Sequence, residues 1–424
     1  MRWKLLNSFD YIYILDLHGN VMSREGAGAT ERDENIFDIQ QGVCICFFIK
    51  TGDTTEKKAS VYYSSLFGSR ERKYQFLSTK TIRDLDWQEV TPTKPYYFFK
   101  PKNFGESASY DDGIQLSALF PHYLGGIKTH NDEGLVSDMP FDTGFDQLYA
   151  YRPFDIKHIN YDLSKVKRPR TEIMKNFVGH NNLGLVIDRQ VVTDNWSHIQ
   201  IVKYMIDNRL HYSHKGIPVL CPMFLYETET RKFPNLNMGE LRKFSTNLSV
   251  KFSPAITDDA NKFDMVDLFD YCYGILHSSS YRAKYKELLS IDFPRVPVPV
   301  DSTMFRNIVK IGAHLRQLHL LEIPTENKLG IELKGNGDNV VSCCKFDNGK
   351  AYINHSRYFS NVREDIWDFC FAGYHGLQKW FKDRRQQILS ASDIEHVIKV
   401  FNVFDQTEAD MMLIDTILEE YDLV

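Results

Sequence analysis

The sequence predicts a mixed α/β fold, with a partial sheet at the front, a loop-rich central α/β region and a helical C-terminal region. Residues 11–17 and 37–50 are nearly continuous apolar runs, which is typical of buried strands. In residues 264–278 and 302–322, apolar side chains recur at helical spacing. The chain has 424 residues, of which 43% are hydrophobic and 25% charged, so it can bury the cores of two or three domains.

The first part, residues 1–80, consists mainly of expected strands. Residues 59–68 are predicted to return antiparallel to the strand at 37–50, and a glycine-rich charged loop is expected at 18–35. Open α/β sheets place further strands before such a loop, and here no strand precedes residue 11. We therefore expect an incomplete sheet with Tyr11–Leu17 as an unpaired edge.

The remaining chain is expected to form two further parts, residues 81–322 and 323–424. The first of them combines strands with helices, and the second begins with short strands and ends in helices. Ser392 and Glu395 have the spacing of a capping box. The expected strands are 182–192, 194–207 and 216–227, and the expected helices are 264–278, 280–292, 302–322, 364–387, 390–404 and a tail helix from Glu408.

Composition excludes several classes of protein. No apolar run approaches the roughly 20 residues of a membrane span, and the first residues lack the apolar region of a secretory signal. The seven cysteines contain no C-x-x-C pair, which favours reduced thiols in a cytoplasmic protein. His211 and His214 have ligand spacing without a third ligand, so no metal is expected there.

Catalytic motifs are missing from the sequence. It has no glycine-rich phosphate loop, nucleophile elbow, H-E-x-x-H or Walker sequence. The run Glu332-Leu333-Lys334 is similar to the E-x-K end of metal-dependent nucleases, but no matching upstream aspartate is apparent. A plain exposed strand is the alternative interpretation. No catalytic residue is therefore predicted.

A concentration of positive charge lies between Tyr149 and Lys175, although the whole chain carries a net charge of -5. Guanidinium groups fork onto phosphates or guanine edges, and prolines 153 and 169 favour turns over a helix. The stretch is therefore a candidate nucleic-acid surface, with a solvated charged loop as the alternative. Its cations are Arg152, Lys157, Lys165, Lys167, Arg168, Arg170 and Lys175, and its nearby aromatic residues are Tyr149, Tyr151 and Phe154.

Seven blocks in conserved order along the chain resemble the C-terminal part of the type ISP restriction–modification enzymes. In those single-chain proteins, nuclease, helicase-like motor, adenine methyltransferase and target-recognition domain follow one another. The blocks are FDYIYILDLHGN (9–20), DENIFDIQQGVCICFFIK (33–50), YRPFDIKHINYD (151–162), KRPRTEIMKN (167–176), YGILHSSSYRAKYKELLSIDFPRVPVP (273–299), LRQLHLLE (315–322) and GYHGLQKWFKDRRQQILSASDIEH (373–396).

The resemblance gives each part of the chain an expected role. Residues 1–80 would be the end of an adenine-methyltransferase sheet, 81–322 the target-recognition domain and 323–424 its C-terminal strand-plus-helix part. The chain contains neither Asn-Pro-Pro-Tyr nor the cofactor loop, so it binds no cofactor alone; S-adenosylmethionine is expected in the full-length enzyme. The expected partners are double-stranded DNA and the upstream methyltransferase, motor and nuclease domains, with no membrane.

The resemblance also implies site residues. Phe37 is placed near the pocket for a flipped adenine, with a core position at a strand start as the alternative. The principal DNA-binding candidates are Arg152, Lys157, Lys165, Lys167, Arg168, Arg170, Arg189, Trp196 and His198. Possible base readers are Asn181, Asn182 and Gln190, because their amides pair with adenine. The helical cations Arg282, Lys284, Lys286, Lys379, Lys382, Arg384 and Arg385 are candidates for backbone contacts or for plain solvation.

Three functions are therefore open from the sequence. The leading hypothesis is sequence-specific recognition of duplex DNA for an adenine-N6 methyltransferase in bacterial defence. A second is a partner subunit that completes a methyltransferase in trans through the edge at Tyr11–Leu17. A third is a metal-dependent nuclease that depends on Glu332.

Overall fold

The chain divides into two compact units, residues 1–106 (unit 1) and 107–424 (unit 2). The computed structural model describes residues 1–20, 33–52, 58–94, 96–101, 107–193 and 195–424. Strands and helices occur in both units, which confirms the mixed α/β fold class. Residues 81–101 fall with the front sheet, and residues 323–424 fall in the same unit as the central region, so the predicted boundaries at 80 and 322 differ from this division.

Unit 1 contains one four-stranded sheet with the order β2-β1-β3-β4. Its strands are β1 (Tyr11–Asp16), β2 (Cys44–Ile49), β3 (Ser60–Ser65) and β4 (Gln88–Val90). Residues 59–68 run antiparallel to the strand at 37–50, as predicted, but the expected hairpin pairing is wrong because β1 lies between β2 and β3. The predicted edge at Tyr11–Leu17 is wrong as well, since β1 lies between β2 and β3. The exposed edge next to it is β2.

A buried lysine of α2 (Arg70–Thr79) connects Leu17, directly after β1, with Asp33. Lys73 is fully buried, and its Nζ donates to the carbonyl of Leu17 at 2.7 Å and to Asp33 Oδ1 at 2.7 Å. A buried ammonium requires such partners, so Lys73 fixes the chain on both sides of the predicted loop at 18–35. Most of that loop, residues 21–32, lies outside the described residues.

The centre of unit 2 consists of two four-stranded sheets. Their orders are β11-β10-β13-β6 and β12-β8-β9-β7, and they share an apolar core that includes Ile127, Tyr149, Val186 and Leu220. The strands are β6 (Leu124–Gly125), β7 (Val136–Ser137), β8 (Asp146–Arg152), β9 (Asp155–Asn160), β10 (Gly184–Asp188), β11 (Ile199–Val202), β12 (Met205–Ile206) and β13 (Pro218–Pro222).

Two predicted helices cross closely beside these sheets. α8 (Met265–Ile275) and α11 (Ser302–His319) confirm the helices expected at 264–278 and 302–322. A Cβ on Gly312 would lie 1.9 Å from the carbonyl oxygen of Asp270, so the crossing requires glycine in α11. Arg316 Nε donates to Asp270 Oδ1 at 2.7 Å across the same contact, and burial raises the pKa of Asp270 to about 6.

The C-terminal part forms a small sheet and a long helix. α14 (Ala391–Glu420) is one continuous helix, whereas two helices were predicted from 390 and 408. Its capping box joins Ser390 and Asp393, so the predicted box of Ser392 and Glu395 is wrong. The sheet has the order β19-β22-β21-β20, with strands β19 (Glu332–Lys334), β20 (Lys345–Asp347), β21 (Lys350–Tyr352) and β22 (Tyr358–Ser360).

The single helix predicted at 364–387 is interrupted by a hairpin. Helices α12 (Glu364–Trp367) and α13 (Gln378–Asp383) flank the antiparallel strand pair of β23 (Cys370–Phe371) and β24 (Tyr374–His375). Gly373 and Gly376 adopt positive φ values of 80° and 43°, which end helical geometry and allow the turn. The apolar spacing that predicted a helix here instead buries Ile366, Trp367, Phe371 and Phe381 in the C-terminal core.

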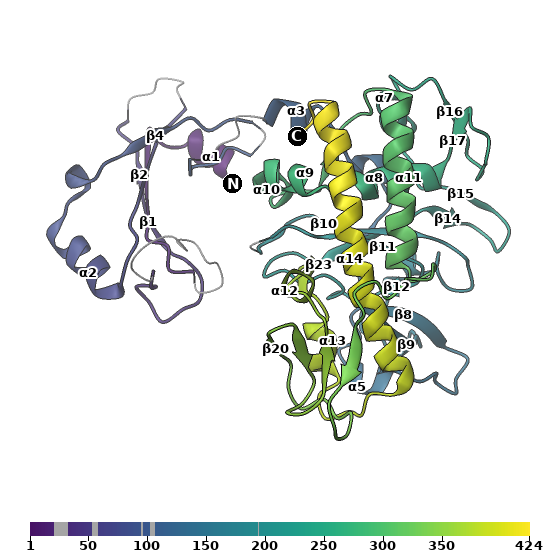
Figure 1. Cartoon of the computed structure of the whole chain (residues 1–424). Coiled ribbons are helices and arrows are strands. Elements are labelled where there is room, and N and C mark those ends of the chain that lie inside the picture. The colour runs from purple at the N-terminus through teal and green to yellow at the C-terminus, as the bar shows by residue number, and fades with distance from the viewer. Residues whose placement is uncertain (21–32, 53–57, 95, 102–106, 194) are drawn as a thin grey trace. The chain divides into compact units, whose positions relative to one another are not determined.

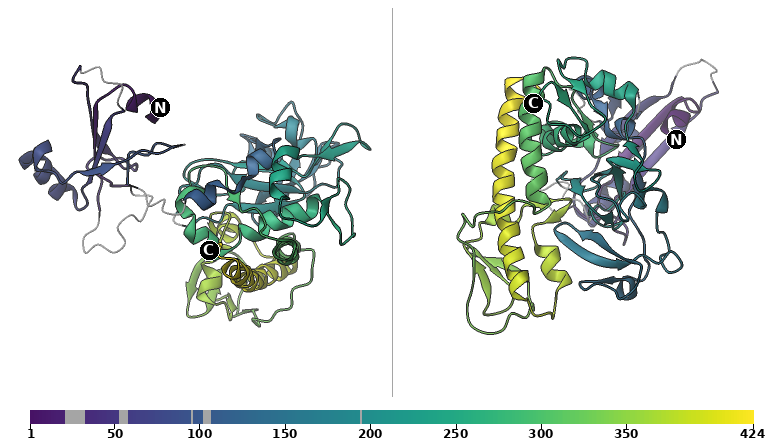
Figure 2. Two further views of the ribbon diagram at one scale, coloured as in Figure 1. Left: turned by 90° about the horizontal axis from the view of Figure 1, so that it is seen from above. Right: turned by 90° about the vertical axis from the view of Figure 1, so that its right-hand side faces the viewer.

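Helices α11 and α14 lie side by side, and α14 continues past α11 toward α12 and α13 (Figures 1 and 2). Polar contacts fix the pair: His314 Nδ1 lies 2.6 Å from Asp410 Oδ2, and His319 Nε2 lies 2.8 Å from Thr407 Oγ1. His319 Nδ1 also meets the Tyr273 hydroxyl of α8 at 2.6 Å. The predicted tail helix is therefore part of the core of unit 2.

The other helices and strands are short connections. In unit 1 they are α1 (Arg2–Leu6) and η1 (Ile82–Asp84). In unit 2 they are α3 (Ser107–Asp111), β5 (Ile114–Gln115), α4 (Leu116–Leu119), α5 (Asp132–Leu135), α6 (Thr171–Met174), β14 (Phe224–Tyr226), β15 (Lys232–Pro234), α7 (Met238–Phe244), β16 (Lys251–Phe252), β17 (Lys262–Phe263), α9 (Ser279–Lys284), α10 (Lys286–Leu289) and β18 (Arg295–Val296). Among the described residues, none of the helices combines the length and apolar character needed to cross a bilayer.

The buried His319 gives a testable pH dependence. Burial lowers its pKa to about 3, below the ordinary value of 6.5, so the unfolded chain binds the proton more tightly. The stabilising contribution is present above pH 6.5 and is lost as the pH falls. We expect the stability of the native protein relative to His319→Gln to fall by about 1.4 kcal/mol per pH unit between pH 6 and pH 4. Urea unfolding of both proteins measures this difference; a constant difference across that range would contradict it.

Candidate nucleic-acid interface

Residues 162–170, here called the basic loop, connect β9 to α6 and form a defined turn. Asp162 Oδ1 accepts from the backbone N–H of Ser164 at 3.0 Å, and the Tyr161 hydroxyl donates to the carbonyl of Pro169 at 2.6 Å. Arg168 and Lys128 exchange two backbone hydrogen bonds, of 2.9 and 3.2 Å. These bonds hold the basic loop against the segment that contains Lys128.

The loop presents positive charge to solvent. Lys165, Lys167 and Arg168 are exposed, and Lys128 is half-buried beside them. Lys165 pairs with Asp162 at 3.3 Å, whereas within the described part of the chain Lys167 and Arg168 have no ion pair. Arg170 has a left-handed backbone with φ of 59°, and its buried Nε has no hydrogen-bond partner. The result is a compact group of cations whose charge is largely uncompensated.

Two cations of the predicted cluster are held elsewhere. Arg152 is 7% exposed and donates to Asp207 Oδ1 at 2.8 Å, and the Tyr149 hydroxyl donates to Asp207 Oδ2 at 2.6 Å. Burial raises the pKa of Asp207, and the Arg152 guanidinium opposes this shift. Lys157 Nζ lies 3.1 Å from Asp138 Oδ1. Arg152 is thus an internal ion-pair residue, and the expectation that it shares a surface with the basic loop is wrong.

Of the other three principal candidates, two are buried and one is exposed. Trp196 and His198 are buried, at 4% and 0% exposure, and burial lowers the pKa of His198 to about 4. His198 Nε2 lies 2.7 Å from the carbonyl of Tyr212, so its role within the described residues is structural. Arg189 is exposed, with an ion pair of 3.1 Å to Asp292. DNA contact by these residues stays a prediction, and burial weighs against it for Trp196 and His198.

A groove of about 440 Å³ begins at α6, directly after the basic loop. Glu172, Lys175 and Glu227 provide charge in its lining, and Tyr226 and Phe233 provide aromatic surface. His180 stacks on Tyr226, with ring centroids 3.8 Å apart. Cations followed by a groove with exposed aromatic surface suit a ligand with both phosphates and flat rings.

The predicted base readers differ in accessibility. Asn182 is buried, and its amide is consumed by the backbone: Nδ2 donates to the carbonyls of Asn176 and Phe224, and Oδ1 accepts from two N–H groups. It therefore has no free edge for a base. Asn181 is exposed and Gln190 is half-buried, so both remain candidates.

The helical cations do not form one surface group. Arg282 donates to the carbonyl of Leu276 at 2.5 Å, and burial lowers its pKa to about 10. Arg384 is buried in an ion pair of 2.8 Å with Asp155, and Lys379 pairs with Asp383. These three have internal partners. Lys284, Lys286, Lys382 and Arg385 are exposed.

Nothing in the described structure supports the nuclease hypothesis. Glu332 lies on β19 with 64% of its side chain exposed, and it pairs with Lys334 at 3.1 Å. His211 is buried, and its Nδ1 lies 2.6 Å from Asp188 Oδ2. His214 is not part of this contact. Among the described residues, no three His, Cys, Asp or Glu side chains are grouped so as to hold a metal ion.

In unit 1, Phe37 lies outside the strands. It is 53% exposed, in a bend before β2, and its backbone N–H donates to Asn35 Oδ1 at 2.9 Å. The alternative of a core position at a strand start is therefore wrong. An exposed ring remains available for contact with a base, which stays a prediction.

Lys128 and the groove residues other than Lys175 were missed by sequence reasoning. The one local signal for Lys128 is the preceding glycine pair, Gly125 and Gly126. A Cβ on Gly126 would lie 2.4 Å from the carbonyl oxygen of Asp207, so the backbone there approaches another strand closely. Such a glycine pair indicates close packing, but it does not identify the basic loop as the neighbour.

Unit 2 is thus a mixed α/β domain with a basic loop and an adjoining groove, and its described residues contain no group of metal ligands. A family model described as the Type ISP C-terminal specificity domain matches residues 126–413, and the chain belongs to this family. That match confirms the resemblance drawn from the sequence blocks. A search of curated proteins found no match.

Three solved structures share the fold. The first is described as the ATP-dependent Type ISP restriction-modification enzyme LlaBIII bound to DNA: TM-score 0.73, 19% identity, 98% of this chain and 31% of that chain. The second is described as a nuclease-deletion mutant of the Type ISP restriction-modification enzyme LlaGI in complex with a DNA substrate mimic. Its TM-score is 0.68 at 18% identity, and the match covers 98% of this chain and 44% of that chain. The third is a DrdV–DNA complex. Its TM-score is 0.72 at 16% identity, and the match covers 99% of this chain and 48% of that chain. This chain therefore spans less than half of the length of each of them.

Proposed function

We propose that this chain recognises a specific sequence in double-stranded DNA for a restriction–modification system. The observation that carries the proposal is the basic loop: Lys165, Lys167 and Arg168 are exposed beside Lys128 in a domain of a specificity family. Phosphate contacts by such cations would fix the register on the duplex, and groups in the adjoining groove would read base edges. The net charge of -5 is compatible with this, because binding depends on a local positive surface.

The finer proposal is that the recognised site directs adenine-N6 methylation. The support is the resemblance of residues 9–20 and 33–50 to the end of an adenine-methyltransferase sheet, together with the exposed ring of Phe37. S-adenosylmethionine would be bound by the upstream methyltransferase domain, and the motor and nuclease would act in that same assembly in the cytoplasm. Methylation by this chain alone is not expected.

Selection from a randomised duplex library tests the proposal, because the target sequence is unknown. We expect enrichment of one short sequence and a linear fall of log K with log salt. Each base-pair change in the enriched site should weaken binding by about 1–3 kcal/mol. Equal binding to every duplex, with no dependence on salt between 50 and 200 mM, would overturn the proposal.

A second candidate function is completion of a methyltransferase in trans, and the edge strand β2 favours it. Phe47, Phe48 and Ile49 of β2 are exposed at 42%, 39% and 37%, and β2 pairs only with β1 among the described strands. An apolar strand with a free edge is a docking surface for another strand. The docking edge is thus β2, where the sequence had indicated Tyr11–Leu17.

Mixing the chain with the upstream polypeptide and measuring methyl transfer tests this candidate. Phe47→Lys should abolish the gain in activity, because an ammonium on an edge strand opposes pairing. Met139→Lys, at a residue of unit 2 that is 71% exposed, is the matched control and should leave the gain unchanged. Full activity with Phe47→Lys would remove β2 as the docking edge.

A further inference from the structure

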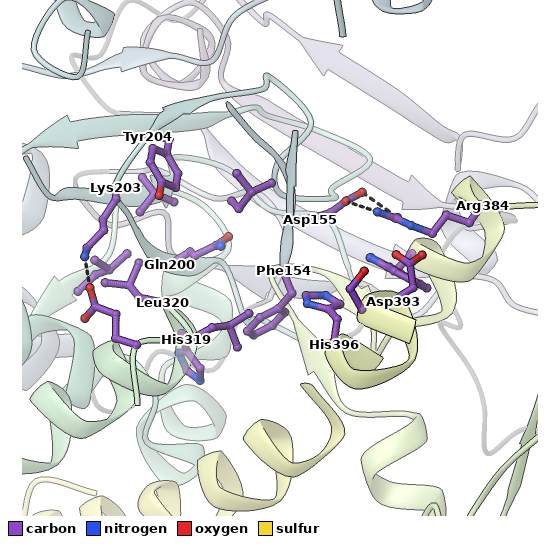
Figure 3. A pocket seen from close by; sticks show the side chains of 17 residues that line it. Phe154, Asp155, Gln200, Lys203, Tyr204, His319, Leu320, Arg384, Asp393 and His396 are labelled. Carbon is purple, nitrogen blue, oxygen red and sulfur yellow. Dashed lines mark hydrogen bonds and ion pairs between the residues drawn. The ribbon is translucent and has the colours of Figure 1, made fainter. Parts of the chain in front are cut away.

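A second cavity of unit 2, distinct from the groove at α6, has a volume of about 490 Å³. It lies between the start of β9, strand β11, the residues after α11, helix α13 and the first turn of α14 (Figure 3). Phe154, Ile156 and Leu320 contribute apolar walls. The cavity reaches the surface, since Ile156 on its rim is 46% exposed. Its size is that of a small-molecule site, and polar side chains line it together with the apolar ones.

The first polar group in this cavity is the amide of Gln200. The residue is 5% exposed and its side chain points into the cavity from β11 (Figure 3). Its Oε1 is buried and has no hydrogen-bond partner among the described residues. A buried acceptor without a partner is unfavourable, so rotation of the amide toward a donor in the cavity would be favourable.

The second polar group is the imidazole of His396, in the first part of α14. Its Nε2 is also buried without a hydrogen-bond partner. Burial lowers the pKa of His396, so the ring is neutral near pH 7. Trp380 stacks on it, with centroids 5.6 Å apart and an interplanar angle of 26°, which holds the ring in place.

The charged groups around the cavity already have partners. Arg384 Nη2 lies 2.8 Å from Asp155 Oδ1, Lys203 pairs with Glu322, and Asp393 caps the first turn of α14 (Figure 3). No unpaired cation of the described lining is left for a phosphate. Besides the Gln200 amide and the neutral His396 imidazole, the Tyr204 hydroxyl lines the cavity, so the cavity suits an uncharged ligand with its own donors and acceptors.

We propose that this cavity binds a nucleobase, with adenine preferred. A glutamine amide pairs with adenine through two hydrogen bonds, in which Oε1 accepts from the 6-amino group and Nε2 donates to a ring nitrogen. The free Oε1 of Gln200 and the apolar walls match that ring. The choice of a nucleobase rests on the proposed function, because DNA contact is what brings bases to this domain. The ring comes from a free nucleoside or from a base extruded from the duplex.

Ligand-observed saturation-transfer NMR with adenosine and the full chain tests the cavity. We expect saturable binding that is at least tenfold weaker for inosine, which has an oxygen in place of the 6-amino group. Gln200→Leu should weaken adenosine binding at least tenfold, and Ile156→Trp should block the cavity from its rim. Gln75→Leu, at an exposed residue of α2 in unit 1 outside the cavity lining, is the matched control. Thermal unfolding of each variant shows that it is folded.

A competition experiment distinguishes the two sources of the ring, a free nucleoside and a base extruded from the duplex. Displacement of adenosine by the selected duplex in the native protein indicates an extruded base, and duplex binding without displacement indicates a free nucleoside. Adenosine that does not bind, or that binds equally to the native protein and to folded Gln200→Leu and Ile156→Trp, overturns the proposal. Duplex affinity measured by gel shift is independent of this readout, so a chain that binds adenosine but no duplex refutes the proposed function and leaves the cavity assignment standing.

Discussion

Replacing Lys165, Lys167 and Arg168 together with glutamine is expected to reduce duplex DNA affinity roughly tenfold or more at 100 mM salt. The three side chains are exposed, and the loop that carries them is fixed by Asp162, by Pro169 and by the backbone pairing with Lys128. If each contacts one phosphate, the slope of log K against log salt should fall by about 2–3, because fewer counterions are released. Fluorescence anisotropy from 50 to 200 mM salt measures both quantities.

A second triple variant, which also removes three positive charges, distinguishes the loss of the basic loop from a change in net charge. Lys251, Lys310 and Lys328 are exposed lysines of unit 2 outside the basic loop, and the triple glutamine variant should keep the native slope. The preference for the selected sequence should persist in both variants, since phosphate contacts add affinity without reading bases. Equal slopes for the two triple variants would remove the basic loop from the interface.

Gly312→Ala is expected to destabilise unit 2 by about 3 kcal/mol or more, the upper part of the range for overpacking. The added Cβ would lie 1.9 Å from the carbonyl oxygen of Asp270, which is backbone and cannot rotate away. Helices α8 and α11 would have to separate, and the bond of 2.7 Å between Arg316 and Asp270 would be strained as well. Urea unfolding followed by circular dichroism measures the loss.

Gly144→Ala is the matched control for this substitution. Nothing lies within 4 Å of a Cβ at Gly144, so its stability should change by no more than about 0.5 kcal/mol. Native stability of Gly312→Ala would mean that α8 and α11 do not cross at this point. The DNA-binding slope of folded Gly312→Ala should stay native, because the basic loop lies on another part of unit 2.

Local sequence was a good guide wherever one periodic pattern covers a whole element. α8 and α11 were predicted from apolar spacing alone, and both bury apolar side chains in the core. The pattern failed at 364–387, where Gly373 and Gly376 turn the chain into a hairpin while the same apolar residues still reach the core. Periodicity reports which residues are buried, and several backbone paths satisfy the same burial.

The candidate site was predictable only in part. The cations of residues 165–170 stand out as a local run, and their exposure follows from the turn in which they lie. Arg152 belongs to the same run, yet it is buried because Asp207, 55 residues later, supplies a carboxylate beside it. Gln200 and His396 carry no local signal at all, since strand β11 and helix α14 meet only through the packing of unit 2.

The sequence by itself determined the family, the mixed α/β class, the amphipathic helices and the density of positive charge, because each of these is written in adjacent residues. Tertiary structure alone decided which strand is the edge, which cations face solvent, and which buried polar atoms lack partners. The physical reason is that pairing, burial and desolvation depend on groups far apart in the chain, and a residue's chemistry is set by the neighbours that folding brings to it.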